Sequence, residues 1–160
     1  LINSDYHIGY QIKRDELHKL LINDYKIYSS YEPCIYPGVN SKFFWNSEYN
    51  NTKYIGMCQC SISCSGKGNG SGNGNCKKIT ISTFQSGSVI ITGARNMQQI
   101  NDSYRFINSI FDNHYNILKK TNAPFLEYEE SENKLKIPKK NNNIIYLKKS
   151  NIVYRPDIKN

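Results

Sequence analysis

Two short runs of β-branched residues dominate the hydrophobic pattern of the chain, one over 79–84 and one over 89–92. Such residues fit a pleated surface, and the polar segment 85–88 between them predicts a β-hairpin. Alternation places two sets of side chains of the first strand on opposite faces: Ile79, Ile81 and Thr83, against Thr80, Ser82 and Phe84. Neither face is cleanly polar, which indicates that more protein or a ligand covers the second face.

The remaining pattern predicts further strands over 2–12, 39–46 and 54–57. Helical spacing of apolar residues predicts a helix over 13–23 and a longer one over 96–119 that begins at the N-cap Asn96. The stripe of the longer helix comprises Met97, Ile100, Tyr104, Ile107, Phe111 and Leu118. The order β-α-β-(insert)-β-β-α predicts an α+β domain, in which two helices cover one face of an antiparallel sheet and leave the other face free.

Two segments depart from this pattern. In the insertion at 47–76, glycines recur at every second position from 66 to 74, which predicts a flexible loop without a core. The segment 121–160 is polar and basic, so we expect a domain over 1–120 followed by a partly disordered tail. Within that tail, 144–147 and 152–154 have the composition of short strands or of exposed apolar segments.

The chain has 160 residues and a formal net charge of +8, which favours an anionic partner, nucleic acid before a membrane. No apolar run approaches the ~18 residues that span a bilayer, and no signal peptide is apparent. We therefore expect an intracellular, reducing location. The first residue is Leu, so we expect a piece of a longer protein. No catalytic triad, acid pair or Walker motif occurs in a suitable context, and we expect no enzyme.

Four of the five cysteines fall within the insertion: Cys58, Cys60, Cys64 and Cys76. Four soft ligands this close together match the requirement of a tetrahedral zinc site, which would stabilise a loop that has no core of its own. The alternative is a set of reduced thiols on a flexible loop. Cys34 is predicted to be a small buried residue in a strand.

Two motifs resemble the TATA-box-binding protein family. YSSYEPCIYPG at 28–38 and FQSGSVIITGAR at 84–95 follow the order and spacing of the family repeat, apart from the insertion. The Tyr-Glu-Pro segment is most similar to the second, C-terminal repeat, and the resemblance covers 2–120. The divergence and the inserted Cys/Gly loop resemble the variants of giant DNA viruses, which implies the nucleus or a cytoplasmic viral factory.

The resemblance implies a half-saddle, a curved antiparallel sheet with two helices on its convex face. The concave face would bind and bend A/T-rich promoter DNA through the minor groove. Phe84 matches one aromatic wedge. Tyr36 matches a second, where the family has Phe, and either enters a base step or stacks on a sugar. The other residues implied in DNA binding are Ile90, Thr92, Ser82, Lys42, which matches an Arg that reaches a phosphate, and Asn3.

The face assignment depends on the register of the hairpin. A two-residue loop at 86–87 would set Phe84 opposite Val89, whereas a three-residue loop at 86–88 would set it opposite Ile90. The resemblance requires Phe84 and Ile90 on one face, so we expect the three-residue loop.

The family also implies partners, namely a transcription factor IIB-like protein and the RNA polymerase. Its saddle needs two repeats, of which this chain has one, so a second repeat upstream or a second copy of the chain would complete it. The alternative function is that of an accessory nucleic-acid- or protein-binding domain of a larger protein, without a role at promoters.

Overall fold

The computed structural model describes residues 2–49 and 54–121, together with the backbone of 146–148 and 151–153. Its elements are β1 (Ile2–His7), α1 (Arg14–Asn23), β2 (Tyr28–Ser30), β3 (Val39–Trp45), β4 (Lys77–Thr83), β5 (Ser88–Ala94), α2 (Met97–Asn113), α3 (Tyr115–Leu118), β6 (Tyr146–Lys148) and β7 (Asn151–Val153). No helix in these described parts is long and apolar enough to cross a membrane.

The chain divides into two compact units, Leu1–Phe125 and Leu126–Asn160. In the second unit, β6 and β7 pair antiparallel. Most of the predicted tail at 121–160 lies outside the described residues, so the predicted disorder and the domain boundary at 120 stay predictions.

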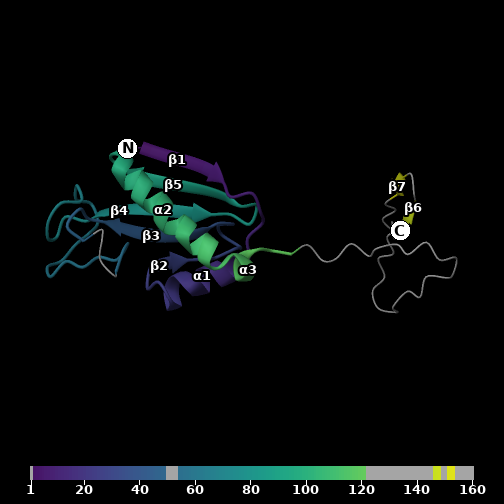
Figure 1. Ribbon diagram of the computed structural model, residues 1–160, viewed down its shortest axis with the longest axis horizontal. Helices are drawn as coiled ribbons and strands as arrows, with labels where there is room; N and C mark the ends of the chain where they lie inside the picture. The colour runs from purple at the N-terminus through teal and green to yellow at the C-terminus, as the bar shows by residue number, and fades with distance from the viewer. Residues whose placement is uncertain (1, 50–53, 122–145, 149–150, 154–160) are drawn as a thin grey trace. The chain divides into compact units, whose positions relative to one another are not determined.

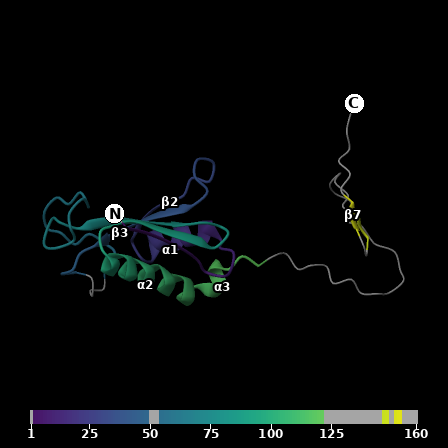
Figure 2. The same cartoon turned by 90° about the horizontal axis from the view of Figure 1, so that it is seen from above.

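The first unit is built on an antiparallel five-stranded sheet with the order β1-β5-β4-β3-β2 (Figure 1). Helices α1 and α2 lie on the same face of this curved sheet (Figure 2). Helix α1 packs on β2 and β3, and α2 packs on β5, β1 and β3. The predicted α+β fold is therefore confirmed.

The core lies between the helices and one face of the sheet. Alternate residues of β4, Ile79 and Ile81, are fully buried there. They meet the apolar stripe of α1, represented by Leu17 and Leu21, and that of α2. Burying side chains of this size stabilises a fold by about 1.5–3 kcal/mol each, so this layer carries most of the stability of the unit.

Several predicted bounds differ from the structure. Strand β2 was not predicted, because its 3 residues are too few to show a period. The predicted strand at 54–57 is a turn, closed by a hydrogen bond from Met57 N to Tyr54 O and by the positive φ of Gly56. The predicted helix at 96–119 ends at Asn113 and resumes as α3 after His114, although Asn96 caps it as predicted.

The hairpin register also differs by two residues from the prediction. Phe84 N donates to Ser88 O at 2.9 Å, so Phe84 lies opposite Ser88 and not Ile90. The loop has three residues, but they are 85–87, and Gly87 takes the left-handed conformation (φ +96°) that such loops require at their third position. Because side chains alternate with period two, a shift of two residues leaves Phe84 and Ile90 on the same face.

Candidate functional site

The sheet face that the helices leave uncovered is called the free face. Strand pairing places Ser82 between Asn40 and Ile90, and Thr80 between Lys42 and Thr92, on this face. Together with their neighbours at the same alternation, the free-face residues are Asn3, Asp5, His7, Tyr28, Ser30, Asn40, Lys42, Phe44, Lys78, Thr80, Ser82, Phe84, Ser88, Ile90 and Thr92. The structure thus brings together six of the seven predicted DNA-contacting residues, and places the seventh, Tyr36, beside them.

Polar side chains in the middle of the free face hydrogen-bond to one another. Ser82 Oγ donates to Asn40 Oδ1 at 2.6 Å, and Lys42 Nζ donates to Thr80 Oγ1 at 2.9 Å. Partial burial, and then the nearby charge of Lys78, lower the pKa of Lys42. These hydrogen bonds keep the polar side chains close to the sheet, so that a flat partner can approach it.

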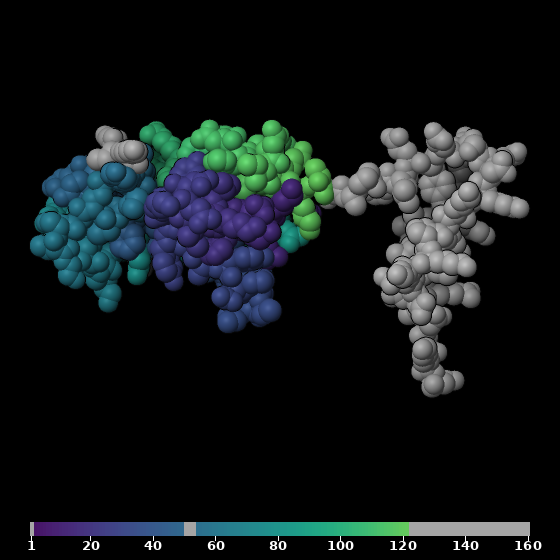
Figure 3. All heavy atoms as spheres, turned by 90° about the horizontal axis from the view of Figure 1, so that it is seen from below, coloured from purple at the N-terminus to yellow at the C-terminus, as the bar shows by residue number. Residues whose placement is uncertain are grey.

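An aromatic pair stands at one end of this face. The rings of Tyr36 and Phe84 lie 5.7 Å apart between centroids, with their planes inclined at 57°. A Cβ atom at Gly38 would lie 2.7 Å from Tyr36 Cε1 and 3.1 Å from Phe84 Cε1, so a larger residue at this position would displace the Tyr36 ring from its present place. The connection between β2 and β3, which carries Tyr36, protrudes from the surface on the side away from α2 (Figure 3).

Arg14, the first residue of α1, links the two loops that carry these rings. Its guanidinium donates one hydrogen bond to Pro37 O, beside Tyr36, and another, 3.0 Å long, to Gln85 Oε1, beside Phe84. It also lies over the ring of Tyr31, 5.3 Å from the centroid. Sequence reasoning missed this residue, because nothing in the sequence indicates which loops an arginine in α1 reaches.

Sequence reasoning also missed Asn40 and Tyr28, which lie on the free face. Asn40 alternates with Lys42 in a strand that was predicted, so the same alternation could have found it. Tyr28, with 64% of its surface exposed, lies opposite Lys42 in the unpredicted strand β2. Cys34 was predicted to be buried, but it is exposed in the turn that precedes Tyr36.

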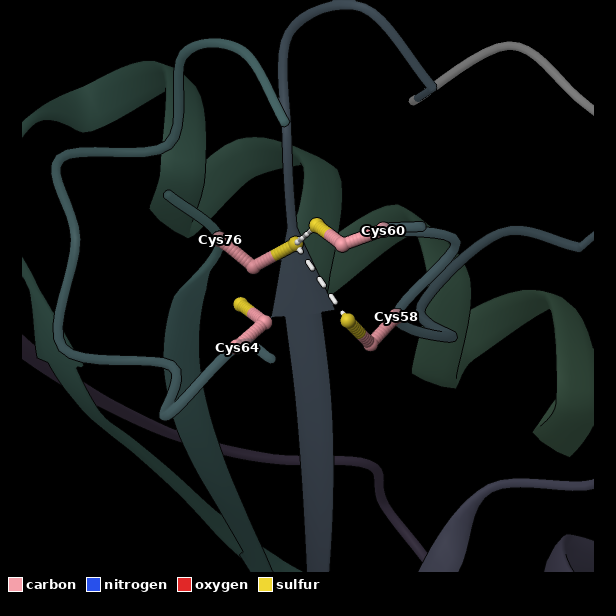
Figure 4. A group of neighbouring side chains, drawn as sticks. All are labelled: Cys58, Cys60, Cys64 and Cys76. Carbon is pink, nitrogen blue, oxygen red and sulfur yellow. Dashed lines mark hydrogen bonds between the residues drawn. The ribbon is translucent and has the colours of Figure 1, made fainter. Parts of the chain in front are cut away.

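The second candidate site is the cysteine cluster at the other end of the sheet. The Sγ atoms of all four predicted ligands lie within 4.8 Å of one another, and their side chains converge (Figure 4). Cys76 Sγ lies 3.4 Å from that of Cys60 and 3.8 Å from that of Cys58. A zinc ion bound by four thiolates at ~2.3 Å separates its sulfurs by about 3.8 Å, so the donor set fits a tetrahedral metal ion.

The thiols differ in their surroundings. Burial raises the pKa of the Cys76 and Cys58 thiols. Burial also acts to raise the pKa of Cys64, but hydrogen bonds from the backbone of Gly66 and Cys76 and from neighbouring thiols lower it overall. A metal ion here would displace thiol protons, and its binding would weaken as the pH falls.

The glycine tract around the cluster is folded rather than flexible, contrary to the prediction. Gly70 O accepts from Ser47 N at 2.8 Å, Gly70 N donates to Asn75 O at 2.7 Å, and the residue lies against the ring of Trp45. A Cβ atom on Gly70 would approach Trp45 Cε3 to 2.3 Å. At Gly70, and at Gly66 beside Phe44, the backbone packs directly on the end of the sheet and leaves no room for a side chain.

Comparison with known families agrees with this geometry. The family model described as transcription factor TFIID, or TATA-binding protein (TBP), matches residues 15–114. The chain belongs to this family, which indicates a DNA-binding role related to transcription.

Among curated proteins, a TATA-box-binding protein-like protein of Acanthamoeba polyphaga mimivirus is 32% identical over 126 residues. The match covers 74% of this chain and 28% of the relative, so the chain spans less than a third of the protein it resembles. The comparison with solved structures gave no significant match.

Proposed function

We propose that the free face binds A/T-rich promoter DNA through the minor groove and bends it, and that the chain acts as part of a transcription initiation factor without enzymatic activity. The observation that carries this proposal is the aromatic pair of Tyr36 and Phe84 at the end of the free face in a member of this family. Apolar side chains inserted between base steps kink a duplex towards the major groove.

The chemistry of the free face explains the preference for A·T pairs. In the minor groove, the amino group of guanine is the main feature that separates G·C from A·T. Ile90 has no hydrogen-bond acceptor for this amino group, and its branched side chain would crowd the group against the sheet. Flexible steps such as TA unstack at low cost, so a protein that inserts aromatic rings selects them.

This proposal is tested by titrating a fluorescent TATA-containing duplex and a GC-substituted duplex with the protein. We expect the TATA duplex to bind more tightly, and Phe84→Ala to weaken that binding by about 1–3 kcal/mol, the usual value of one base–aromatic contact. Tyr104→Ala is the matched control, because Tyr104 is an exposed aromatic residue of α2, on the opposite side of the sheet. Equal binding of both duplexes, unaffected by Phe84→Ala, would reject the proposal.

The partners proposed for the complete factor are a transcription factor IIB-like protein and the RNA polymerase, in the nucleus or in a cytoplasmic viral factory. The free face of one repeat would bury about half of the DNA surface of a two-repeat saddle. We therefore propose that a second repeat in a longer protein, or a second copy of this chain, completes the interface.

We further propose that Cys58, Cys60, Cys64 and Cys76 hold a structural zinc ion. Zinc would fix the insertion to the end of the sheet without taking part in a reaction. Protein purified in reducing buffer without chelator should contain close to one zinc per chain by elemental analysis. Cys64→Ser should abolish this, whereas Cys34→Ser, at the exposed fifth cysteine, should not. A zinc content below half an equivalent in the wild type contradicts the proposal.

A further inference from the structure

A pocket of about 640 Å³ lies where the insertion meets the sheet, and its lining is almost entirely cationic. Lys67, Lys77, Lys78 and Arg95 line it together with Gly66. No carboxylate lines this pocket, and none of its cations takes part in an ion pair found among the described residues. Four cationic residues lining one pocket without an acidic partner are the composition expected for a site that binds an anion.

The backbone holds this pocket in shape. Lys67 and Lys77 form an antiparallel bridge, and Lys78 N donates to Gly66 O at 2.7 Å. Gly66 has φ +71°, and a Cβ atom there would lie 2.6 Å from Lys78 Cβ. Arg95 Nη2 reaches Lys67 O at 3.4 Å from the far side. The insertion therefore contributes one wall, and the strand ends contribute the other.

The pocket opens beside the free face. Lys78 and Phe84 share one face of β4 and its extension and are six positions apart, which corresponds to about 20 Å along a strand. Successive phosphates of one DNA strand advance by about 3.4 Å along the helix axis. If the helix axis of a duplex on the free face runs along β4, a phosphate roughly six nucleotides from the base step at the aromatic pair would lie at the pocket.

We propose that this pocket binds a backbone phosphate of the DNA that lies on the free face, so that the insertion extends the interface beyond the sheet. This inference rests on the proposed function. The insertion would then raise the affinity for DNA of any base sequence, because phosphate contacts carry no sequence information.

The test compares the salt dependence of DNA binding for two double variants. Lys67→Gln/Arg95→Gln removes two charges from the pocket at exposed positions. Lys26→Gln/Arg105→Gln removes the same charge from exposed positions outside the free face. The slope of log K against log salt changes by about 0.9 per phosphate contacted. We expect the slope of the pocket variant to be shallower than that of the control variant by about the amount for one phosphate. The preference for the TATA duplex should be unchanged.

Identical slopes for the two double variants would overturn the pocket proposal, and would assign the pocket to another anion, such as an acidic protein segment. If binding nevertheless depends on Phe84 and prefers the TATA duplex, the proposed function stands without it. If the wild-type chain binds both duplexes equally and regardless of Phe84→Ala, both proposals fail. Near-ultraviolet circular dichroism of each variant verifies that the fold is retained.

Discussion

The two faces of the five-stranded sheet are built from alternate residues of the same strands, but they differ in chemistry. On β4, Ile79 and Ile81 are fully buried beneath the helices, whereas Thr80 and Lys78 face away from them. The covered face is continuous and apolar. The free face combines small hydroxyl groups, two cations and an aromatic pair. The alternation thus separates residues that stabilise the fold from residues that are available for recognition, position by position.

The largest effect that this comparison predicts is on the covered face. Ile81→Ala removes a fully buried side chain from the centre of the sheet and should lower the free energy of unfolding by about 2–5 kcal/mol. Its neighbour on the free face provides the control, since Thr80→Ala should change stability far less. Urea denaturation followed by fluorescence measures both. Similar losses for the two variants would mean that the faces are not energetically distinct.

An intermediate effect is expected at Arg14, which belongs to a helix on the covered face but supports the free face. Arg14→Gln removes the guanidinium that joins the loops of Tyr36 and Phe84, and should weaken DNA binding by up to about 1.5–3 kcal/mol, the usual value of hydrogen bonds of a charged donor. Arg105→Gln, on α2, is the control. If the aromatic pair acts without this support, Arg14→Gln binds DNA as tightly as the control does.

The smallest effect is expected at Ser82, a free-face residue that also contributes to the stability of the fold. Ser82 belongs to the free face but is only 7% exposed, because Asn40 and its other neighbours cover it. Ser82→Ala should cost about 0.5–1.5 kcal/mol of stability through the lost hydrogen bond. A double-mutant cycle with Asn40→Ala isolates that contact. A coupling energy near zero would show that the pair does not order the centre of the free face.

The parts of this architecture that the sequence predicts are those that local hydrophobic patterns encode. The strands of the hairpin follow from period two. The sharing of one face by Phe84 and Ile90 was implied by the family resemblance, and it survives a register error of two residues because side chains alternate with that period. The helices follow from apolar stripes, although Met97 and Tyr104 lie at the edges of the α2 stripe and are largely exposed.

Features that depend on contacts between distant segments could not be predicted in the same way. Arg14 hydrogen-bonds to Pro37 and Gln85, which lie 23 and 71 positions away from it in the sequence. The folding of the glycine tract depends on the ring of Trp45 and on the carbonyl of Asn69, which accepts from Gln99 of α2 at 3.1 Å. The composition of the tract alone is that of a flexible linker. The clustering of the cysteines was predictable because they are close in sequence, whereas the pocket beside them was not.

The cysteine cluster has a consequence for how the sheet assembles. Strands β3 and β4 are neighbours at its centre, but the chain between them runs from 46 to 76 instead of making a short turn. Loop-closure entropy rises by about 0.6 kcal/mol for each doubling of length, so this connection costs on the order of 2 kcal/mol more than a tight hairpin. Asn46 Nδ2 lies 3.5 Å from Cys76 Sγ, which places one ligand beside the residue where the loop begins. A metal ion bound before the strands pair would shorten the effective loop, and the central pairing of the sheet would then form faster.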